Sequence, residues 1–296
     1  MGFFNELTEG RRTVSRVNVK NIARSFLPPI LFEFGRFVVR KLDKQPCFEY
    51  APAGWKTVLP HAENIGWDST RAAETERAKW QAFCANLEGT RPVAFSHGHT
   101  DLSAMCVSFH NVNLTYAYVL ALAAHRKDSV SVLDWGGSLG HYYLMGKAML
   151  PGVGIDFHCK EVSRTAEIGR RVNPDVRWYS DESCLAKTYD LVMLNGVLQY
   201  IQDWPDAIRH IASAVKGYLF LGLLPLVDGA PGFVALQHHY GTEMLHEQFN
   251  RQMLLQVVER TGLHLVREFV TGYRPSIMNA PEQCELRSWL FKKESK

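Results

Sequence analysis

A glycine-rich turn between an apolar run and a helix-like segment is the first feature of this sequence that could bind a ligand. The run Val132-Leu133-Asp134 leads into residues with little or no side chain: Gly136, Gly137, Ser138 and Gly140. A backbone without side chains can approach a ligand closely, and open α/β sheets bind ligands at the carboxyl ends of their strands. The sequence therefore predicts a small-molecule site here, with Asp134 at its edge.

The spacing of the glycines discriminates between ligand classes. A dinucleotide-binding turn has glycine at its first, third and sixth positions. Counted from Gly136, the third and sixth positions hold Ser138 and His141, which disfavours a dinucleotide. Glycine, small residue and glycine at alternating positions after an acid instead resembles motif I of class I S-adenosylmethionine methyltransferases. The resemblance implies S-adenosyl-L-methionine as the cofactor and Gly136, Gly137, Ser138 and Gly140 as residues that bind it.

Two further acids stand where such a cofactor would need them. Glu161 ends the second predicted strand, where a carboxylate can accept hydrogen bonds from both ribose hydroxyls. Asp181 follows the third strand and could meet the adenine amino group. Each acid alone is also typical of a solvated strand end. With Asp134, however, acids stand at three successive strand ends, and we predict that all three bind the cofactor.

The fourth predicted strand ends in polar residues that begin with Asn195, expected beside the cofactor. Adenine-N6 methyltransferases carry Asn or Asp, two prolines and an aromatic residue at this point. Here Asn195 is followed by Gly-Val-Leu. We therefore expect no nucleic-acid substrate.

Histidine is suited to removing a proton from a hydroxyl acceptor during methyl transfer. His238 and His239 follow the fifth predicted strand, in a segment that we expect to be irregular and to overhang the methyl group. His141 begins the helix after the glycine turn. We predict His238 or His239 as the catalytic base, while ordinary surface or core hydrogen bonding is the alternative interpretation.

A different class of enzyme is suggested by His97, His99 and Asp101, which have the spacing of a two-metal hydrolase loop. Such loops continue with a second histidine, but Leu102 follows Asp101. We prefer a loop that lines the acceptor pocket and predict no metal site. A metal-dependent hydrolase is the alternative, and a non-catalytic binding protein that keeps the fold is a third hypothesis.

Strand-like and helix-like segments alternate from residue 129 onward, as in a parallel sheet with helices on both faces. The predicted strands are 130–134, 154–161, 176–179, 190–194 and 218–224, with a closing antiparallel hairpin of 263–270 and 285–291. The predicted helices are 139–149, 164–172, 207–215 and 250–261. The sequence therefore predicts an α/β fold, and the resemblance to class I methyltransferases implies a Rossmann-like seven-stranded sheet of that family.

The sequence before residue 128 is helical and irregular, with helices predicted at 30–42, 69–87 and 113–126. In the third helix Leu114, Tyr118 and Leu122 recur at helical spacing, which predicts the face laid against the sheet. We therefore expect a helical N-terminal extension or cap at 1–128 and a cofactor-binding domain at 129–296.

Charge is concentrated at the N-terminus. Residues 1–44 hold nine basic and four acidic side chains, a net charge of +5. The rest of the chain carries −2, so the total is +3. Such an arm could contact an anionic membrane surface or a polyanion. A helix packed on the catalytic domain with solvated charges is the preferred interpretation.

The location of the protein is predicted from what its sequence does not contain. The six cysteines form no CxxC pair, which favours a reducing compartment. No apolar run has the length of a signal peptide core or a membrane span. We expect a cytoplasmic protein, with peripheral membrane contact through the basic arm as a further option.

The pattern over residues 129–291 is also similar to a family of methyltransferases often encoded among cell-surface polysaccharide genes. The supporting segments are Pro28–Leu31, Tyr50–Trp55, Leu133–Gly137, Val197–Tyr200, Gln237 and Phe249-Asn250, whereas Trp67–Gly98 departs from the family pattern. The resemblance implies a small-molecule acceptor. O-methylation of a sugar or glycan precursor is the first expectation, and a natural product or lipid-linked intermediate is the second.

Overall fold

The computed structural model describes residues 48–59, 66–88, 90, 92–94, 106–239 and 242–294. Pro46–Lys296 forms one compact unit. The predicted helix at 30–42, the basic arm and the motif His97, His99 and Asp101 all lie outside the described residues.

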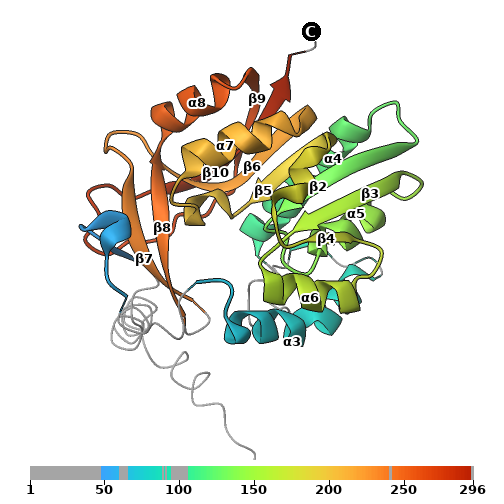
Figure 1. Cartoon of the computed structure of the whole chain (residues 1–296), viewed down its shortest axis with the longest axis horizontal. Helices are drawn as coiled ribbons and strands as arrows, with labels where there is room; N and C mark the ends of the chain where they lie inside the picture. The colour runs from blue at the N-terminus through green and yellow to red at the C-terminus, as the bar shows by residue number, and fades with distance from the viewer. Residues whose placement is uncertain are drawn as a thin grey trace, which may run out of the picture. The chain divides into compact units, whose positions relative to one another are not determined.

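Within the described residues, ten strands form one sheet that branches at β6 (Figure 1). The strands are β1 (Phe48–Tyr50), β2 (Ser129–Trp135), β3 (Gly154–Lys160), β4 (Arg177–Tyr179), β5 (Tyr189–Asn195), β6 (Val215–Val227), β7 (Phe233–His239), β8 (Thr242–Asn250), β9 (Leu263–Val270) and β10 (Glu285–Lys293). Strands β4, β3, β2, β5 and β6 are parallel neighbours in that order. Strand β10 runs antiparallel between β6 and β9. These seven strands are the predicted α/β sheet, which is confirmed.

The helices cover both faces of this sheet (Figure 1). They are α3 (Thr70–Leu87), α4 (Val107–Ala124), α5 (His141–Met149), α6 (Ser163–Val172), α7 (Trp204–Ser213) and α8 (Arg251–Glu259), with short 3-10 turns η1 (Gly54–Lys56), η3 (Glu182–Ala186) and η4 (Leu198–Tyr200). Successive strand residues face opposite sides, so Leu133 joins the core beneath α7 and α8, whereas Val132 joins the core beneath α3, α4 and α5. No described helix has both the length and the apolar composition needed to cross a membrane.

The segment after β6 was predicted to be irregular, and this prediction is wrong. Strands β7 and β8 form an antiparallel hairpin there, and the end of β8 runs parallel to the end of β6 through Leu226 and Phe249. The alternating buried positions of β8 include Thr242, His246 and Gln248. Because these buried side chains are polar, the hydrophobic alternation that marks a strand is missing from the sequence. His238 and His239 therefore lie in a strand.

The predicted packing face of α4 is only partly correct: Leu122 packs against the core and Tyr118 contacts Phe269 of β9, but neither Leu114 nor Tyr118 is buried. Leu114 and Tyr118 are 47% and 45% exposed, whereas Tyr116 and Val119 are completely buried against the sheet. The helix carries apolar side chains on most of its circumference, so their spacing alone does not single out one face. The hydroxyl of Tyr116, which donates a 2.7 Å hydrogen bond to the carbonyl of Tyr142, belongs to the face that packs.

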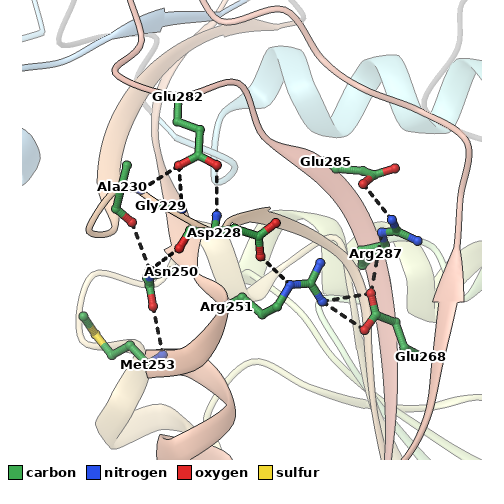
Figure 2. Close-up of polar contacts among 10 residues, drawn as sticks. All are labelled: Asp228, Gly229, Ala230, Asn250, Arg251, Met253, Glu268, Glu282, Glu285 and Arg287. Carbon is green, nitrogen blue, oxygen red and sulfur yellow. Dashed lines mark hydrogen bonds and ion pairs between the residues drawn. The ribbon is translucent and has the colours of Figure 1, made fainter.

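A carboxylate fixes the turn that leads from β6 into the hairpin (Figure 2). Glu282 accepts hydrogen bonds of 2.6 to 3.0 Å from the successive backbone N–H groups of residues 228–230. Asn250 donates to the carbonyl of Ala230 and caps α8 by accepting from the N–H of Met253. These contacts join the turn, the start of α8 and the segment before β10, and so hold the hairpin against β6.

Candidate functional site

A pocket of about 420 Å³ opens at the carboxyl ends of β2, β3 and β5. It contains five of the predicted site residues: Gly136, Ser138, Glu161, Asn195 and His239. The other predicted residues do not line it: Asp134, Gly137, Gly140, Asp181 and His238. The pocket is where an open α/β sheet is expected to bind a ligand, because the strand ends and the turns that follow them meet there.

The glycine turn has the backbone that the sequence predicts. Gly136 has a φ of +76°, and its N–H donates a 2.7 Å hydrogen bond to the carbonyl of Lys160. A Cβ at this position would stand 2.5 Å from Cγ2 of Val197, so the turn can pass beneath Val197 only as glycine. Gly140 opens α5 with the same φ, and a Cβ there would meet the amide of Asn173 at 2.7 Å. Gly136 shapes the pocket, whereas Gly140 permits close packing behind it.

Ser138 joins the glycine turn to Glu161. Its N–H donates a 2.8 Å hydrogen bond to Oε2 of Glu161, and Oε1 accepts a second one, also 2.8 Å, from the N–H of Val162. Burial raises the pKa of the Glu161 carboxyl, while the two amides oppose that shift. Both oxygens are thus held in one orientation at the pocket wall, as a ligand-binding carboxylate requires.

Asp134 lies behind the turn rather than in the pocket. It is 1% exposed, and a Cβ on Gly137 would meet its Oδ2 at 2.4 Å. Oδ2 has no hydrogen-bond partner within the described part of the chain. Burial, with the nearby charge of Glu161, raises the pKa of Asp134 well above the usual range of a carboxyl group. Asp134 could therefore influence a ligand indirectly, by supporting the glycine turn at Gly137.

Asp181 caps a short helix. Its Oδ1 accepts hydrogen bonds from the N–H and the hydroxyl of Ser183, and the hydroxyl bond, followed by the amide bond, lowers the pKa of Asp181. The next residue, Glu182, lines the pocket. The structure therefore brings the predicted strand end to the site but turns the capping carboxylate toward η3.

Asn195 contributes an amide at the end of β5. Its Nδ2 donates to the hydroxyl of Tyr142, and its Oδ1 is buried without a hydrogen-bond partner among the described residues. A buried acceptor without a donor is costly unless something bound nearby satisfies it. Asn195 is therefore a candidate ligand-binding group.

One end of the pocket has aromatic walls. The ring of Trp67 lies edge-on to Tyr200, with centroids 5.2 Å apart, and edge-on to His239 at 6.1 Å. His238 faces away from this group, with Nδ1 3.6 Å from a carboxylate oxygen of Glu243. Neighbouring residues of a strand point to opposite sides, so only one of the two predicted histidines reaches the pocket.

Three charged residues of the pocket, Glu76, Lys160 and Glu182, were not predicted. Glu76 comes from α3, which the sequence indicates only as a charged helix, and the contact that places it spans 62 residues. Lys160 precedes Glu161 and lies 4.6 Å from the centre of the Trp135 ring. Lys160 could have been predicted, because it directly precedes the predicted site residue Glu161. In the described ranges, no group of three His, Cys, Asp or Glu residues could hold a metal ion.

The sequence matches a family model described as a methyltransferase domain over residues 109–268. The match runs from α4 to β9 and includes the glycine turn, Glu161, Asn195 and His239. A search of curated proteins gave no match.

Several solved structures are similar to this chain at low sequence identity. A 1,6-didemethyltoxoflavin-N1-methyltransferase from Burkholderia thailandensis, crystallised with its substrate and S-adenosylhomocysteine, is 14% identical with a TM-score of 0.45, over 83% of this chain and 100% of that one. Magnesium protoporphyrin IX methyltransferase from Synechocystis is 13% identical with a TM-score of 0.44, over 76% and 96%. An amino pentose methyltransferase from Micromonospora echinaspora is 14% identical with a TM-score of 0.42, over 62% and 91%.

Proposed function

The chain belongs to the methyltransferase domain family, as an S-adenosyl-L-methionine-dependent enzyme of the class I fold, and we propose that it methylates a small-molecule acceptor in the 420 Å³ pocket. The observation that carries this proposal is the joint presence, in one pocket, of the glycine turn with its fixed carboxylate Glu161 and of an aromatic end that contains a histidine. The first half suits a nucleoside cofactor and the second suits an acceptor.

The residues present fit the cofactor. Glu161 is held by two amides and is the proposed partner of the ribose hydroxyls. Asn195 has a buried oxygen that needs a donor, and Gly136 allows the turn that lines the pocket to pass beneath Val197. Asp181 with Glu182 is proposed for the adenine end, and Asp134 acts from beneath Gly137 on the turn that faces the methionine portion.

S-adenosylmethionine supplies a methyl group on a positively charged sulfur, and the protein must align an acceptor with it, exclude water and remove a proton from a hydroxyl acceptor. His239 lines the pocket and is the proposed base, in preference to His238. Trp67 and Tyr200 shield the same end of the pocket with large apolar surfaces.

We propose a sugar or glycan precursor as the acceptor. An aromatic wall with a polar edge suits a ring that has an apolar face and several hydroxyl groups. The similarity of residues 129–291 to methyltransferases of cell-surface polysaccharide genes supports the same class. A planar natural product or a lipid-linked intermediate is the alternative acceptor.

The experiment that tests this function is a radiolabel assay. The full-length protein is incubated with methyl-labelled S-adenosylmethionine and with nucleotide sugars, free sugars or planar natural products, and label is followed into product. His239→Gln should abolish transfer to a hydroxyl while His238→Gln retains it. Transfer that survives in His239→Gln but not in His238→Gln would refute the assignment of the base. Failure of the wild type to bind S-adenosylhomocysteine would refute the function itself.

For residues 1–44, whose net charge is +5, solvated charges are the preferred interpretation, and peripheral contact with an anionic membrane surface is the alternative that can be tested. Removal of residues 1–24 should weaken sedimentation with phosphatidylserine vesicles more than it weakens cofactor binding. Equal loss of both would show instead that this segment is needed for the fold.

We also propose that the chain is divided into an extension at 1–128 and a cofactor-binding domain at 129–296.

A further inference from the structure

Helix α3 brings to the pocket a carboxylate that comes from outside the parallel sheet. Glu76 is 7% exposed and lines the pocket together with Ala72, which lies one turn earlier in the same helix. Its Oε2 accepts a 3.2 Å hydrogen bond from the hydroxyl of Ser138. This bond ties α3 to the glycine turn at the residue whose N–H binds Glu161.

Ser138 thus stands between two carboxylates. Its N–H fixes Glu161 and its hydroxyl fixes Glu76, while its own φ of +52° places it in the left-handed region that non-glycine residues rarely adopt. A strained backbone that presents two anions to one pocket is consistent with a ligand that carries positive charge. The cofactor of this family carries positive charges on its sulfur and on its amino group and a negative charge on its carboxylate.

The acids near the turn differ in what they can reach. Asp134 lies beneath Gly137 and does not line the pocket. Glu161 is oriented by the amides of Ser138 and Val162 at the end of β3, where a ribose is expected. Glu76 lines the pocket from helix α3, which lies outside the parallel sheet. Its Oε1 lies 3.9 Å from Nζ of Lys79 in the same helix.

We propose that Glu76 binds the positively charged amino group of the cofactor's methionine portion, with Ser138 holding the carboxylate in place. This inference rests on the proposed function. An ammonium group taken into a pocket loses water and needs an anionic acceptor, and a hydrogen bond between two charged groups is about twice as strong as a neutral one. Helix α3 thereby becomes part of the cofactor site.

The test is a double-mutant cycle in which one change is made on the ligand. S-adenosylhomocysteine and its desamino analogue, which lacks only the amino group, are titrated by calorimetry into the wild type and into Glu76→Gln. The wild type should bind S-adenosylhomocysteine about 10- to 100-fold more tightly than the analogue, the worth of one charged hydrogen bond. Glu76→Gln should bind the two ligands with equal affinity.

Two control variants make the result specific. Glu74→Gln removes an exposed carboxylate of the same helix, paired with Arg77, and should preserve the wild-type ratio. Glu161→Gln should weaken both ligands by the same factor, because both keep the ribose. If Glu76→Gln does not fold, Glu76→Asp keeps the charge but shortens the side chain, and it should show the same loss of discrimination.

The outcomes separate this inference from the proposed function. An unchanged ratio in Glu76→Gln, or in Glu76→Asp if that variant replaces it, would overturn the role of Glu76 and leave the methyltransferase function intact. Equal weakening of both ligands in Glu76→Gln would also overturn it, because it would place Glu76 at the nucleoside or in the fold alone. No binding of S-adenosylhomocysteine to the wild type would overturn both.

Discussion

The hydroxyl of Tyr200 donates a 2.5 Å hydrogen bond to Oε1 of Gln237, and this bond joins η4 to β7 at the proposed acceptor end of the pocket. Burial raises the pKa of Tyr200 above that of a free phenol, which favours the neutral hydroxyl that donates this bond. The bond connects the parallel sheet, which carries the proposed cofactor residues, to the hairpin that carries His239.

Tyr200→Phe should lower the free energy of unfolding in urea by about 1 to 3 kcal/mol, because Oε1 of buried Gln237 loses its donor. Affinity for S-adenosylhomocysteine should stay within about threefold, a difference of less than 1 kcal/mol. Tyr118→Phe, at an exposed position of α4, is the matched control and should alter stability by less than about 0.5 kcal/mol. A large loss of cofactor affinity in Tyr200→Phe would place this residue at the cofactor instead.

Gly136→Ala should damage both stability and cofactor binding, because its Cβ would stand 2.5 Å from Val197 and its φ is +76°. Gly152→Ala is the control: its φ is +94°, but no atom lies within 4 Å of its Cβ. Both variants pay about 1 to 2 kcal/mol for the left-handed backbone. Gly136→Ala should lose about 1 to 3 kcal/mol more through overpacking, measured by urea unfolding, and Val197→Ala should restore part of it.

Glu161→Gln and Asp134→Asn should both weaken cofactor binding. S-adenosylhomocysteine at a hundredfold excess over its dissociation constant should stabilise the wild type by about 2.7 kcal/mol, and both variants should gain much less at that concentration. Glu161→Gln removes the charge of the carboxylate that accepts from Ser138 and that we propose to accept from the ribose, and Asp134→Asn alters the group behind Gly137. NAD should stabilise none of the three proteins. Stabilisation by NAD alone would indicate an oxidoreductase.

Asp190 should make stability depend on pH in the acid range. Burial alone would raise its pKa, but hydrogen bonds from the N–H and hydroxyl of Ser131 and from Lys127 outweigh burial and lower the pKa to about 2. A carboxyl whose pKa is lowered by folding stabilises the protein above its unfolded pKa, and this contribution is lost as the pH falls through its folded pKa.

The free energy of unfolding of the wild type should therefore exceed that of Asp190→Asn by about 2 kcal/mol at neutral pH. The difference should shrink as the pH is lowered from about 4 to about 2, the two pKa values of the carboxyl. Urea unfolding at a series of pH values measures it. Asp175→Asn, at an exposed carboxylate, is the control, and a difference that does not vary with pH would contradict the assignment.

The parallel sheet and the glycine turn were predictable because each signal is local. The buried strand at 190–194 is an apolar run after its first residue, and the turn after Asp134 is rich in glycine. The matched family supports the same conclusion over residues 109–268.

The hairpin was not predictable from hydrophobic alternation. The inner face of β8 includes Thr242, His246 and Gln248, so burial there is decided by polar packing between strands rather than by apolar spacing. Glu76 escaped prediction for a related reason. A buried carboxylate on a charged helix looks like a solvated one until the chain 62 residues later folds against it.

The choice between His238 and His239 could not be made from sequence while their segment was expected to be irregular, because only a strand assigns neighbours to opposite sides. In the hairpin, the side that each histidine faces depends on whether its position in β7 is odd or even. An insertion of one residue in β7 ahead of Gln237, with the pairing to β8 held at the strand's beginning, would exchange the histidines between the two sides, and an insertion of two would restore them. In related chains whose β7 is longer or shorter by an odd number of residues, the histidine in the pocket should occupy the neighbouring sequence position. An alignment of this site should therefore follow the pairing between β7 and β8 instead of residue identity alone.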